Sequence, residues 1–165
     1  MTRLVVRSEA AGDAADVRDV HVAAFESPAE ADLVDVLRRD GLAVVGTVAE
    51  VDGRVVAHAL LGRITVGGVP ALALAPVAVS PEYQRRGLGT LVVRAAIEEA
   101  TLLGERLIVV LGDPRYYARF GFGSAADAGV TAPWTGPALQ VLALPAYDGG
   151  ARGEAVYPAP YLAVG

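Results

Sequence analysis

The sequence has no cysteine and no lysine among its 165 residues, and its only histidines are His21 and His58. Without cysteine there can be no disulfide, thiol nucleophile or cysteine-bound zinc. Without lysine there can be neither Schiff-base catalysis nor the P-loop lysine that binds a nucleotide phosphate. Two distant histidines also exclude a three-histidine metal site and the zinc motif HExxH. We therefore expect a protein that binds no metal.

Basic side chains are outnumbered, since 14 arginines face 19 acidic residues and the net charge is −5. Binding to nucleic acid or to an anionic membrane usually needs a basic patch, so we expect neither partner. No charged start leads into an apolar run at the N-terminus, and the two long uncharged windows, 64–81 and 128–147, are interrupted by proline. We expect a soluble, cytoplasmic protein, although a cysteine-free chain suits either redox compartment.

The length suits one domain with its own core, which we expect to span about residues 3–145, followed by a C-terminal tail, 146–165. Apolar runs and helical periodicity alternate in the order β-α-α-β-β-β-α-β-α-β, which predicts a mixed α/β domain. The predicted strands are 4–7, 42–51, 54–66, 70–79, 106–112 and 139–144, and the predicted helices begin near Asp13 and Ser27 and span about 88–103 and 115–120.

Three short signals predict where elements begin and end. Ser27-Pro28-Ala29-Glu30 is typical of an N-cap, a first-turn proline and a capping-box acid. Asp52-Gly53 predicts a tight hairpin, and Asp113-Pro114 predicts the start of a short helix that Gly121 ends. The capping box explains Glu30 without a functional role, so Glu30 is a weak candidate for a site residue.

The most informative stretch is Gln84-x-x-Gly87-x-Gly89, which lies between a strand and a helix. Glycines let a backbone approach a ligand closely, and the N-terminus of a helix attracts anions. Arg85 and Arg86 could add charge-assisted contacts, so the pattern indicates a phosphate-bearing cofactor. A tight turn made only for geometry is the open alternative. A Rossmann dinucleotide site fits poorly, because residues 87–92 lack the third glycine.

Two motifs carry a resemblance to a known family. Residues 76–90, PVAVSPEYQRRGLGT, resemble the acetyl-CoA-binding motif of the GNAT superfamily of N-acetyltransferases. Residues 116–122, YYARFGF, resemble the Y-x-x-x-G-F element of that family, at a typical distance downstream. The chain is similar over nearly its full length to a bacterial branch of predicted acetyltransferases, which shares Phe25…Glu30-Ala31, Leu111-Gly112-Asp113-Pro114 and a closing Tyr-Pro.

The resemblance implies a fold and an activity. The fold is a central, mostly antiparallel sheet with a splayed pair of strands, flanked by about four helices. The activity is that of an acyltransferase, which moves an acetyl group from acetyl-CoA to a primary amine of a small molecule or protein by direct attack in a ternary complex. The oligomeric state stays open between a monomer and a homodimer.

The resemblance also implies site residues. The strand backbone would bind the pantetheine arm, the loop amides would bind the diphosphate, and Tyr117 would protonate the departing CoA thiolate. Spacing alone does not distinguish Tyr117 from Tyr116, and a packing role for Tyr117 is the alternative. The implied cofactor-binding residues are Val77, Ala78, Val79, Gln84, Arg85, Arg86, Gly87, Leu88, Gly89, Thr90 and Tyr117.

The general base is harder to assign. Many GNAT enzymes use a glutamate on the strand before the loop, or a water chain, but residues 70–79 contain no acid. His58 has the right pKa range and is our tentative base, although a lone histidine on an apolar strand is also typical of a core residue. His21 is a weaker candidate. The missing carboxylate keeps a second class of function open, a non-catalytic acyl-CoA-binding or sensing module on the same fold.

The acceptor is the least determined part. Residues 1–60 hold six arginines and eleven acids, whereas residues 61–165 hold eight of each. The negative balance therefore lies in the segment that would flank the acceptor cleft, which agrees with a cationic amine but is also typical of solvated faces. Phe25, Trp134 and residues 122–145 are candidates for shaping the pocket. An acidic, open cleft would indicate a peptide or polyamine, and a closed apolar pocket a small amine.

Overall fold

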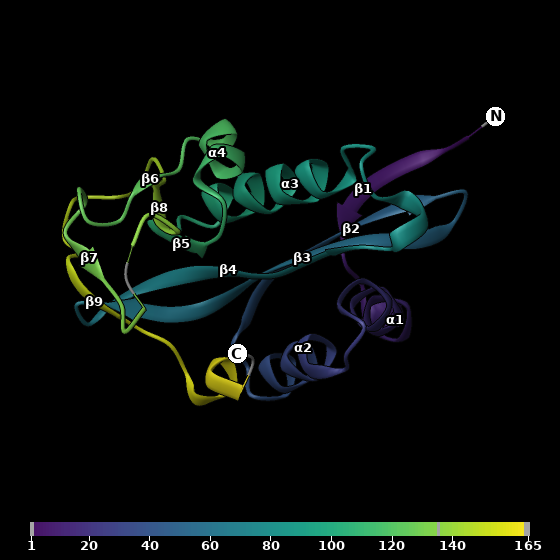
Figure 1. Cartoon of the computed structure of the whole chain (residues 1–165), viewed down its shortest axis with the longest axis horizontal. Coiled ribbons are helices and arrows are strands. Elements are labelled where there is room, and N and C mark those ends of the chain that lie inside the picture. Colours follow the sequence, from purple (N-terminus) through teal and green to yellow (C-terminus); the bar gives the residue numbers. More distant parts are fainter. Residues whose placement is uncertain (1, 135, 164–165) are drawn as a thin grey trace.

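The chain folds into a three-layer arrangement, with a twisted sheet between two pairs of helices (Figure 1). The computed structural model describes residues 2–134 and 136–163. Helices α1 and α2 cover one face of the sheet, and α3 and α4 cover the other (Figure 1). The helices are α1 (Ala14–Phe25), α2 (Ala29–Arg39), α3 (Leu88–Leu102) and α4 (Pro114–Tyr117); the strands are β1 (Leu4–Ser8), β2 (Ala43–Val51), β3 (Arg54–Val66), β4 (Val69–Val79), β5 (Leu107–Leu111), β6 (Gly123–Ser124), β7 (Val130–Thr131), β8 (Leu139–Ala143) and β9 (Gly153–Val156).

The main path through the sheet has the strand order β1-β2-β3-β4-β5-β8-β6, and every pair along it is antiparallel except β4 with β5. Those two strands pair only at Leu72 with Ile108 and at Ala73 with Val109. Beyond Ala73 they diverge, so one edge of β4 lies open from there to its carboxyl end. This confirms the mostly antiparallel sheet, the splayed pair and the four helices that the resemblance implied.

The near-continuous apolar run of β3 reflects burial on both of its faces. Leu60 and Ile64 face α1 and α2, where they join the predicted α2 stripe in one core cluster. Ala59 and Leu61 face α3 and join a second cluster. In the described ranges, no helix combines the length and the apolarity that a membrane span requires.

The capping signals were only partly correct. At α4, Asp113 accepts a hydrogen bond from the Arg115 amide at 2.9 Å, and Gly121 has a φ of 95°, as predicted. At α2, the Ser27 hydroxyl accepts from the Ala29 amide at 3.2 Å, but Pro28 occupies the N-cap position. Within the described chain the Glu30 side chain makes no capping bond, so the capping-box prediction was wrong; Glu30 lies in the first turn of α2, where the helix dipole favours an acid.

The C-terminal segment is not an appendage to the core, contrary to the expected boundary near residue 145. Strand β9 pairs with β3 at Val156 and Ala155, and Ala155 is buried. Tyr161 is also buried and belongs to the core cluster on the α1–α2 face. Four-residue strands carry too little periodicity to be recognised in a sequence, because their position depends on a partner strand far away in the chain.

Candidate active site

The loop after β4 has the geometry of an anion-binding site. Arg85 and Gly87 both adopt left-handed backbone conformations, with φ of 64° and 81°. The Gln84 amide side chain donates to the Val79 carbonyl at 2.9 Å and so ties the loop to the end of β4. Within the described chain, none of the backbone N–H groups from Arg85 to Thr90 has a hydrogen-bond acceptor. These free donors surround the start of α3, where the helix dipole also favours an anion.

A cavity of about 390 Å³ opens onto these amides. Seven of the eleven predicted cofactor-binding residues line it, whereas Val77, Ala78, Arg86 and Tyr117 do not. Arg86 instead lies over the Tyr83 ring, 5.4 Å from its centroid. The complete lining is Val79, Tyr83, Gln84, Arg85, Gly87, Leu88, Gly89, Thr90, Tyr116 and Arg119.

Gly89 is not required by the packing of the protein itself. A Cβ added there would lie 3.5 Å from Val79 Cγ2 and 3.8 Å from the Tyr116 hydroxyl, which are ordinary contact distances. Since Val79 and Tyr116 both line the cavity, a side chain at position 89 would take up space inside it. A ligand that lies against the backbone gives a reason for glycine at this position.

Arg119 is a cavity residue that the sequence analysis did not identify. Its guanidinium lies 4.2 Å from the centre of the Tyr116 ring, and its Nε donates to the Tyr116 carbonyl at 2.9 Å. The Tyr116 hydroxyl in turn lies 3.0 Å from Thr90 Oγ1, in the first turn of α3. These contacts place a second guanidinium beside Arg85 at the anion cavity. No local pattern in the sequence predicts these contacts, because positions 90 and 119 meet only through tertiary packing.

Tyr117 lies outside the lining of the cavity that Tyr116 lines, and the two rings are nearly perpendicular. A Cβ added at Gly112, just after β5, would lie 2.4 Å from Tyr117 Cε2, so the ring lies directly against that glycine. The hydroxyl has no hydrogen-bond partner in the described part of the chain. Burial, and to a lesser degree the neighbouring Tyr116, raises the pKa of Tyr117 to about 12, above the ordinary value of 10. The phenol therefore keeps its proton at neutral pH and can donate it.

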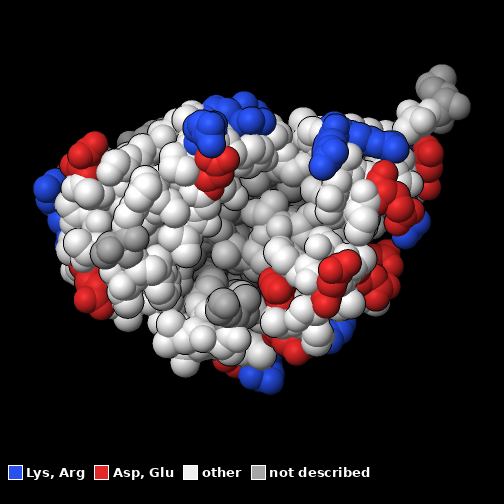
Figure 2. All heavy atoms as spheres, viewed as in Figure 1, with Lys and Arg blue, Asp and Glu red and all other residues white. Residues whose placement is uncertain are grey.

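A larger cavity of about 590 Å³ lies where β4 and β5 diverge. The molecule is visibly hollowed at the centre of this face (Figure 2). Phe25 and Trp134, both candidates for the acceptor pocket, line it, and among the described lining residues Glu30 is the only charged one. The lining is Phe25, Glu30, Leu33, Ala73, Leu74, Ala75, Pro76, Val109, Leu111, Trp134, Tyr157, Tyr161 and Leu162.

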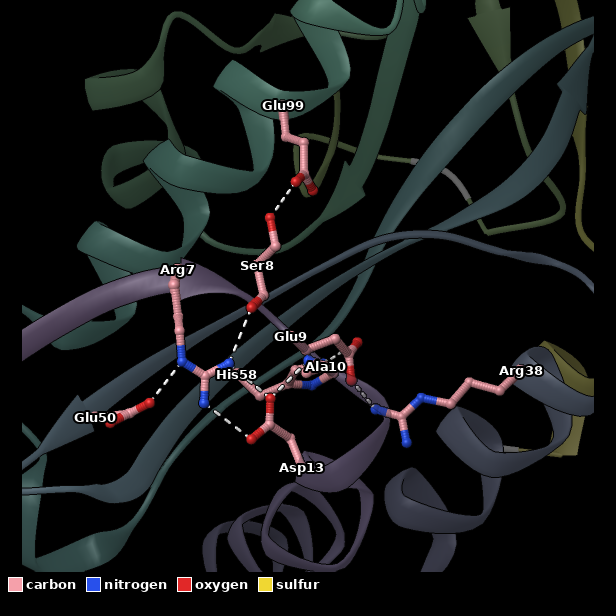
Figure 3. Close-up of polar contacts among 9 residues, drawn as sticks. All are labelled: Arg7, Ser8, Glu9, Ala10, Asp13, Arg38, Glu50, His58 and Glu99. Carbon is pink, nitrogen blue, oxygen red and sulfur yellow. Dashed lines mark hydrogen bonds and ion pairs between the residues drawn. The ribbon is translucent and has the colours of Figure 1, made fainter.

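His58, the tentative base, is fully buried under α1 and lines neither cavity. Its Nδ1 lies 2.8 Å from His21 Nε2, and its Nε2 lies 3.0 Å from a carboxylate oxygen of Glu9. Glu9 also pairs with Arg38, which forms a polar chain between the sheet and α2 (Figure 3). Both ring nitrogens thus have partners, which favours the alternative of a core histidine. His21 is brought to the same place, and burial followed by the charges of His58 and Arg38 lowers its pKa to about 3.

In the part of the chain that the structure describes, six of the eleven acids in residues 1–60 form ion pairs with arginines. Arg7 pairs with Asp13 at 2.7 Å and with Glu50 at 2.5 Å. Arg18 likewise bridges two aspartates of α2. Red acidic side chains gather over α1 and α2 in Figure 2, but they lie on the surface beside the hollow. The negative balance therefore reaches the larger cavity through Glu30 alone.

The sequence is similar to known acetyltransferases. A sequence model of the acetyltransferase (GNAT) family matches residues 14–122. The uncharacterized N-acetyltransferase YjhQ of Escherichia coli K12 is 41% identical over 132 residues, which cover 76% of this chain and 73% of YjhQ. The uncharacterized N-acetyltransferase YhbS of the same strain is 35% identical over 136 residues, which cover 81% of each chain.

Solved structures agree over almost the whole length. The crystal structure of E. coli YhbS in complex with CoA has a TM-score of 0.92 and 33% identity, covering 100% of this chain and 95% of that one. A GNAT family acetyltransferase from Brucella melitensis in complex with acetyl-CoA has a TM-score of 0.82 and 31% identity, covering 96% and 98%. The two cavities therefore lie within a fold that carries CoA or acetyl-CoA in these two proteins.

Proposed function

The chain belongs to the GNAT family of acetyltransferases, and on this premise we propose that it transfers the acetyl group of acetyl-CoA to a primary amine by direct attack in a ternary complex. The observation that carries the proposal is the row of unpaired amides from Arg85 to Thr90. The open edge of β4 leads from this row to the larger cavity.

Acetyl-CoA would be held at two places, the diphosphate and the pantetheine arm. The loop amides, with Arg85 and Arg119, would bind the diphosphate, and the unpaired backbone groups of Val77–Val79 would bind the pantetheine arm. The thioester would then lie where β4 and β5 diverge, next to Tyr117 and at the wall of the larger cavity. Such positioning replaces a bimolecular collision by reaction within one complex, which accounts for much of the acceleration in enzymes of this kind.

The reaction needs two proton movements. The nitrogen lone pair of the neutral amine attacks the thioester carbonyl carbon, and the C–S bond breaks as the carbonyl re-forms. Tyr117 donates its hydroxyl proton to the sulfur that leaves. The surplus proton of the amine goes to Glu30, the carboxylate that lines the cavity, or to water. We leave His58 out of this scheme, because its ring is buried and both of its nitrogens have partners.

Calorimetry with CoA tests the proposal. We expect the protein to bind CoA, and Arg119→Ala to weaken binding about tenfold, because a charge-assisted contact to phosphate is lost. Arg115→Ala is the matched control, since the Arg115 side chain is 96% exposed and does not line the cavity. A folded protein that takes up neither CoA nor any acyl-CoA would refute the proposal.

A non-catalytic acyl-CoA sensor remains the second candidate. It is favoured by the absence of a carboxylate along β4, in the segment Val69–Val79. Release of CoA from acetyl-CoA, measured with a thiol reagent in the presence of pooled primary amines, separates the two. Turnover that depends on the amines supports the enzyme, and tight acetyl-CoA binding without turnover supports the sensor. The cytoplasmic location and the oligomeric state stay predictions.

A further inference from the structure

The larger cavity combines apolar walls with a carboxylate, and this combination indicates which kind of acceptor it can bind. Its walls are aliphatic and aromatic, with Phe25, Trp134, Tyr157 and Tyr161 among them. Glu30 is the one charged side chain in the lining. The size, about 590 Å³, is that of a site for a small molecule.

The Glu30 carboxylate is available to bind a ligand. It lies in the first turn of α2 and is only partly buried. Its carboxylate forms no hydrogen bond or ion pair within residues 2–134 and 136–163. Other acids of this region, such as Asp32 and Asp35, are held by Arg18. An unpaired carboxylate at the wall of an apolar cavity matches a ligand with one positive charge.

Trp134 gives a second sign that a ligand belongs here. Its ring lies 5.1 Å from that of Tyr157, and both rings line the cavity. The indole Nε1 is buried and has no acceptor in the described chain. A buried donor without an acceptor is unfavourable, so a polar atom on a bound molecule would stabilise this wall.

We propose that the acceptor is a small molecule that carries a single primary amine on an aromatic or aliphatic body. This inference rests on the proposed function and names its substrate class. The ammonium form binds at Glu30 and loses one proton to water before it attacks as the neutral amine, and the body lies among Phe25, Leu33 and Trp134. A polyamine or a lysine side chain within a basic peptide fits less well. Each additional positive charge would lose its hydration on entering the cavity and would find no second carboxylate to pair with.

A pair of probes with the same body tests the role of Glu30 without any need for turnover. 2-Phenylethylamine and 2-phenylethanol are titrated into the protein saturated with CoA, which has no acetyl group to transfer. We expect the amine to bind about tenfold more tightly than the alcohol, since only the amine forms a charge-assisted contact. In Glu30→Gln the two should bind equally. Glu26→Gln, which changes an exposed acid outside the lining, should keep the wild-type difference.

A second variant tests the contact with the apolar body. Phe25→Ala should weaken binding of the amine and of the alcohol by the same factor, because both probes lose the same apolar contact. Phe25 is 41% exposed, so we expect the fold to tolerate its replacement. Equal discrimination by wild type and Glu30→Gln would overturn the proposal. More efficient acetylation of spermidine or of a lysine peptide than of 2-phenylethylamine would also overturn it.

The test also separates this proposal from the one on which it rests. If wild type does not bind CoA, the acetyltransferase proposal fails before any amine is added. If CoA binds and 2-phenylethylamine does not, then only the assignment of the acceptor is wrong. Calorimetry of CoA on Glu30→Gln and Glu26→Gln provides the control, because neither residue lines the diphosphate cavity and both variants should bind CoA as wild type does.

Discussion

Tyr116 and Tyr117 are neighbours in the chain, but of the two only Tyr116 lines the cavity at the start of α3. Tyr116 reaches Thr90 at the start of α3 and supports Arg119. Tyr117 lies against Gly112, and its hydroxyl is left without a partner in the described residues. Spacing alone could not separate them, because adjacent residues of a helix differ only in direction and either direction can face a ligand.

The separation of the two tyrosines predicts different effects for the same substitution. Tyr117→Phe should lower kcat by about 100-fold, a typical loss when a positioned acid is removed, and should leave CoA affinity unchanged. Tyr116→Phe should weaken CoA binding, because the hydroxyl contact with Thr90 is lost. Steady-state kinetics and CoA calorimetry on both variants measure this. An unchanged kcat in Tyr117→Phe would show that another group protonates the thiolate.

The structural reason for a glycine differs among three positions at the boundaries of helices and strands. Gly89 lies in the first turn of α3 and has room for a side chain. Gly67 and Gly68 form the turn between β3 and β4, with φ of 55° and 79°. A Cβ added at Gly67 would lie 1.8 Å from the Arg152 carbonyl oxygen, whereas one at Gly68 would meet nothing within 4 Å. The sequence marks all three as glycine but does not distinguish these causes.

At the start of α3, we expect Gly89→Ala to have opposite effects on stability and on binding. Alanine should raise the free energy of unfolding by about 0.5–1 kcal/mol, because it restricts the unfolded chain and favours a helix. It should lower CoA affinity, since the methyl group would enter the smaller cavity, where we propose that the diphosphate binds. Urea unfolding and calorimetry on the same sample give both numbers. Undiminished CoA binding would mean that the diphosphate does not approach this backbone.

For the hairpin, Gly67→Ala should destabilise the protein more than Gly68→Ala. Both alanines pay about 1–2 kcal/mol for a left-handed backbone. Only the variant at Gly67 must also move the segment around Arg152, which leads into β9. The difference between the two urea midpoints therefore measures how firmly the C-terminal segment is packed. Equal midpoints would indicate that this segment moves away at little cost.

At the scale of the whole molecule, two titratable groups with lowered pKa values, His21 and Asp13, make the stability fall as the pH falls below neutral. The pKa of His21 falls from 6.5 when unfolded to about 3 in the fold, so its contribution is present above pH 6.5 and is lost as the pH falls below that value. Asp13, whose pKa is lowered to about 2 mainly by its hydrogen bond from Arg7, contributes above pH 3.8 and loses this contribution toward pH 2.

The expected result is a fall in unfolding free energy between pH 7 and pH 5. At pH 5, His21 alone should cost about 2 kcal/mol, since one pKa unit corresponds to about 1.4 kcal/mol. Urea unfolding at pH 7, 6 and 5 measures the slope, and His21→Leu should reduce it. A slope that is the same in wild type and His21→Leu would mean that the imidazole becomes protonated inside the fold at no cost.

The sequence by itself determined the order of the helices and the longer strands, the glycine-containing loop between β4 and α3, and the membership of the family. These are carried by signals within a few residues of one another, such as a glycine that permits a turn or an apolar stripe at helical spacing. The family resemblance added the splayed sheet, and the structure confirmed it.

Only the tertiary structure decided which distant residues meet. It brought Arg119 to Thr90, paired His58 with His21 in the core and placed Glu30 on the wall of a cavity shared with Trp134. Glu30 looked like a helix cap and His58 like a base because local sequence shows only which role a residue type can fill. Which role it takes depends on how helices pack on the sheet, and that is settled by the burial of apolar faces along the whole chain.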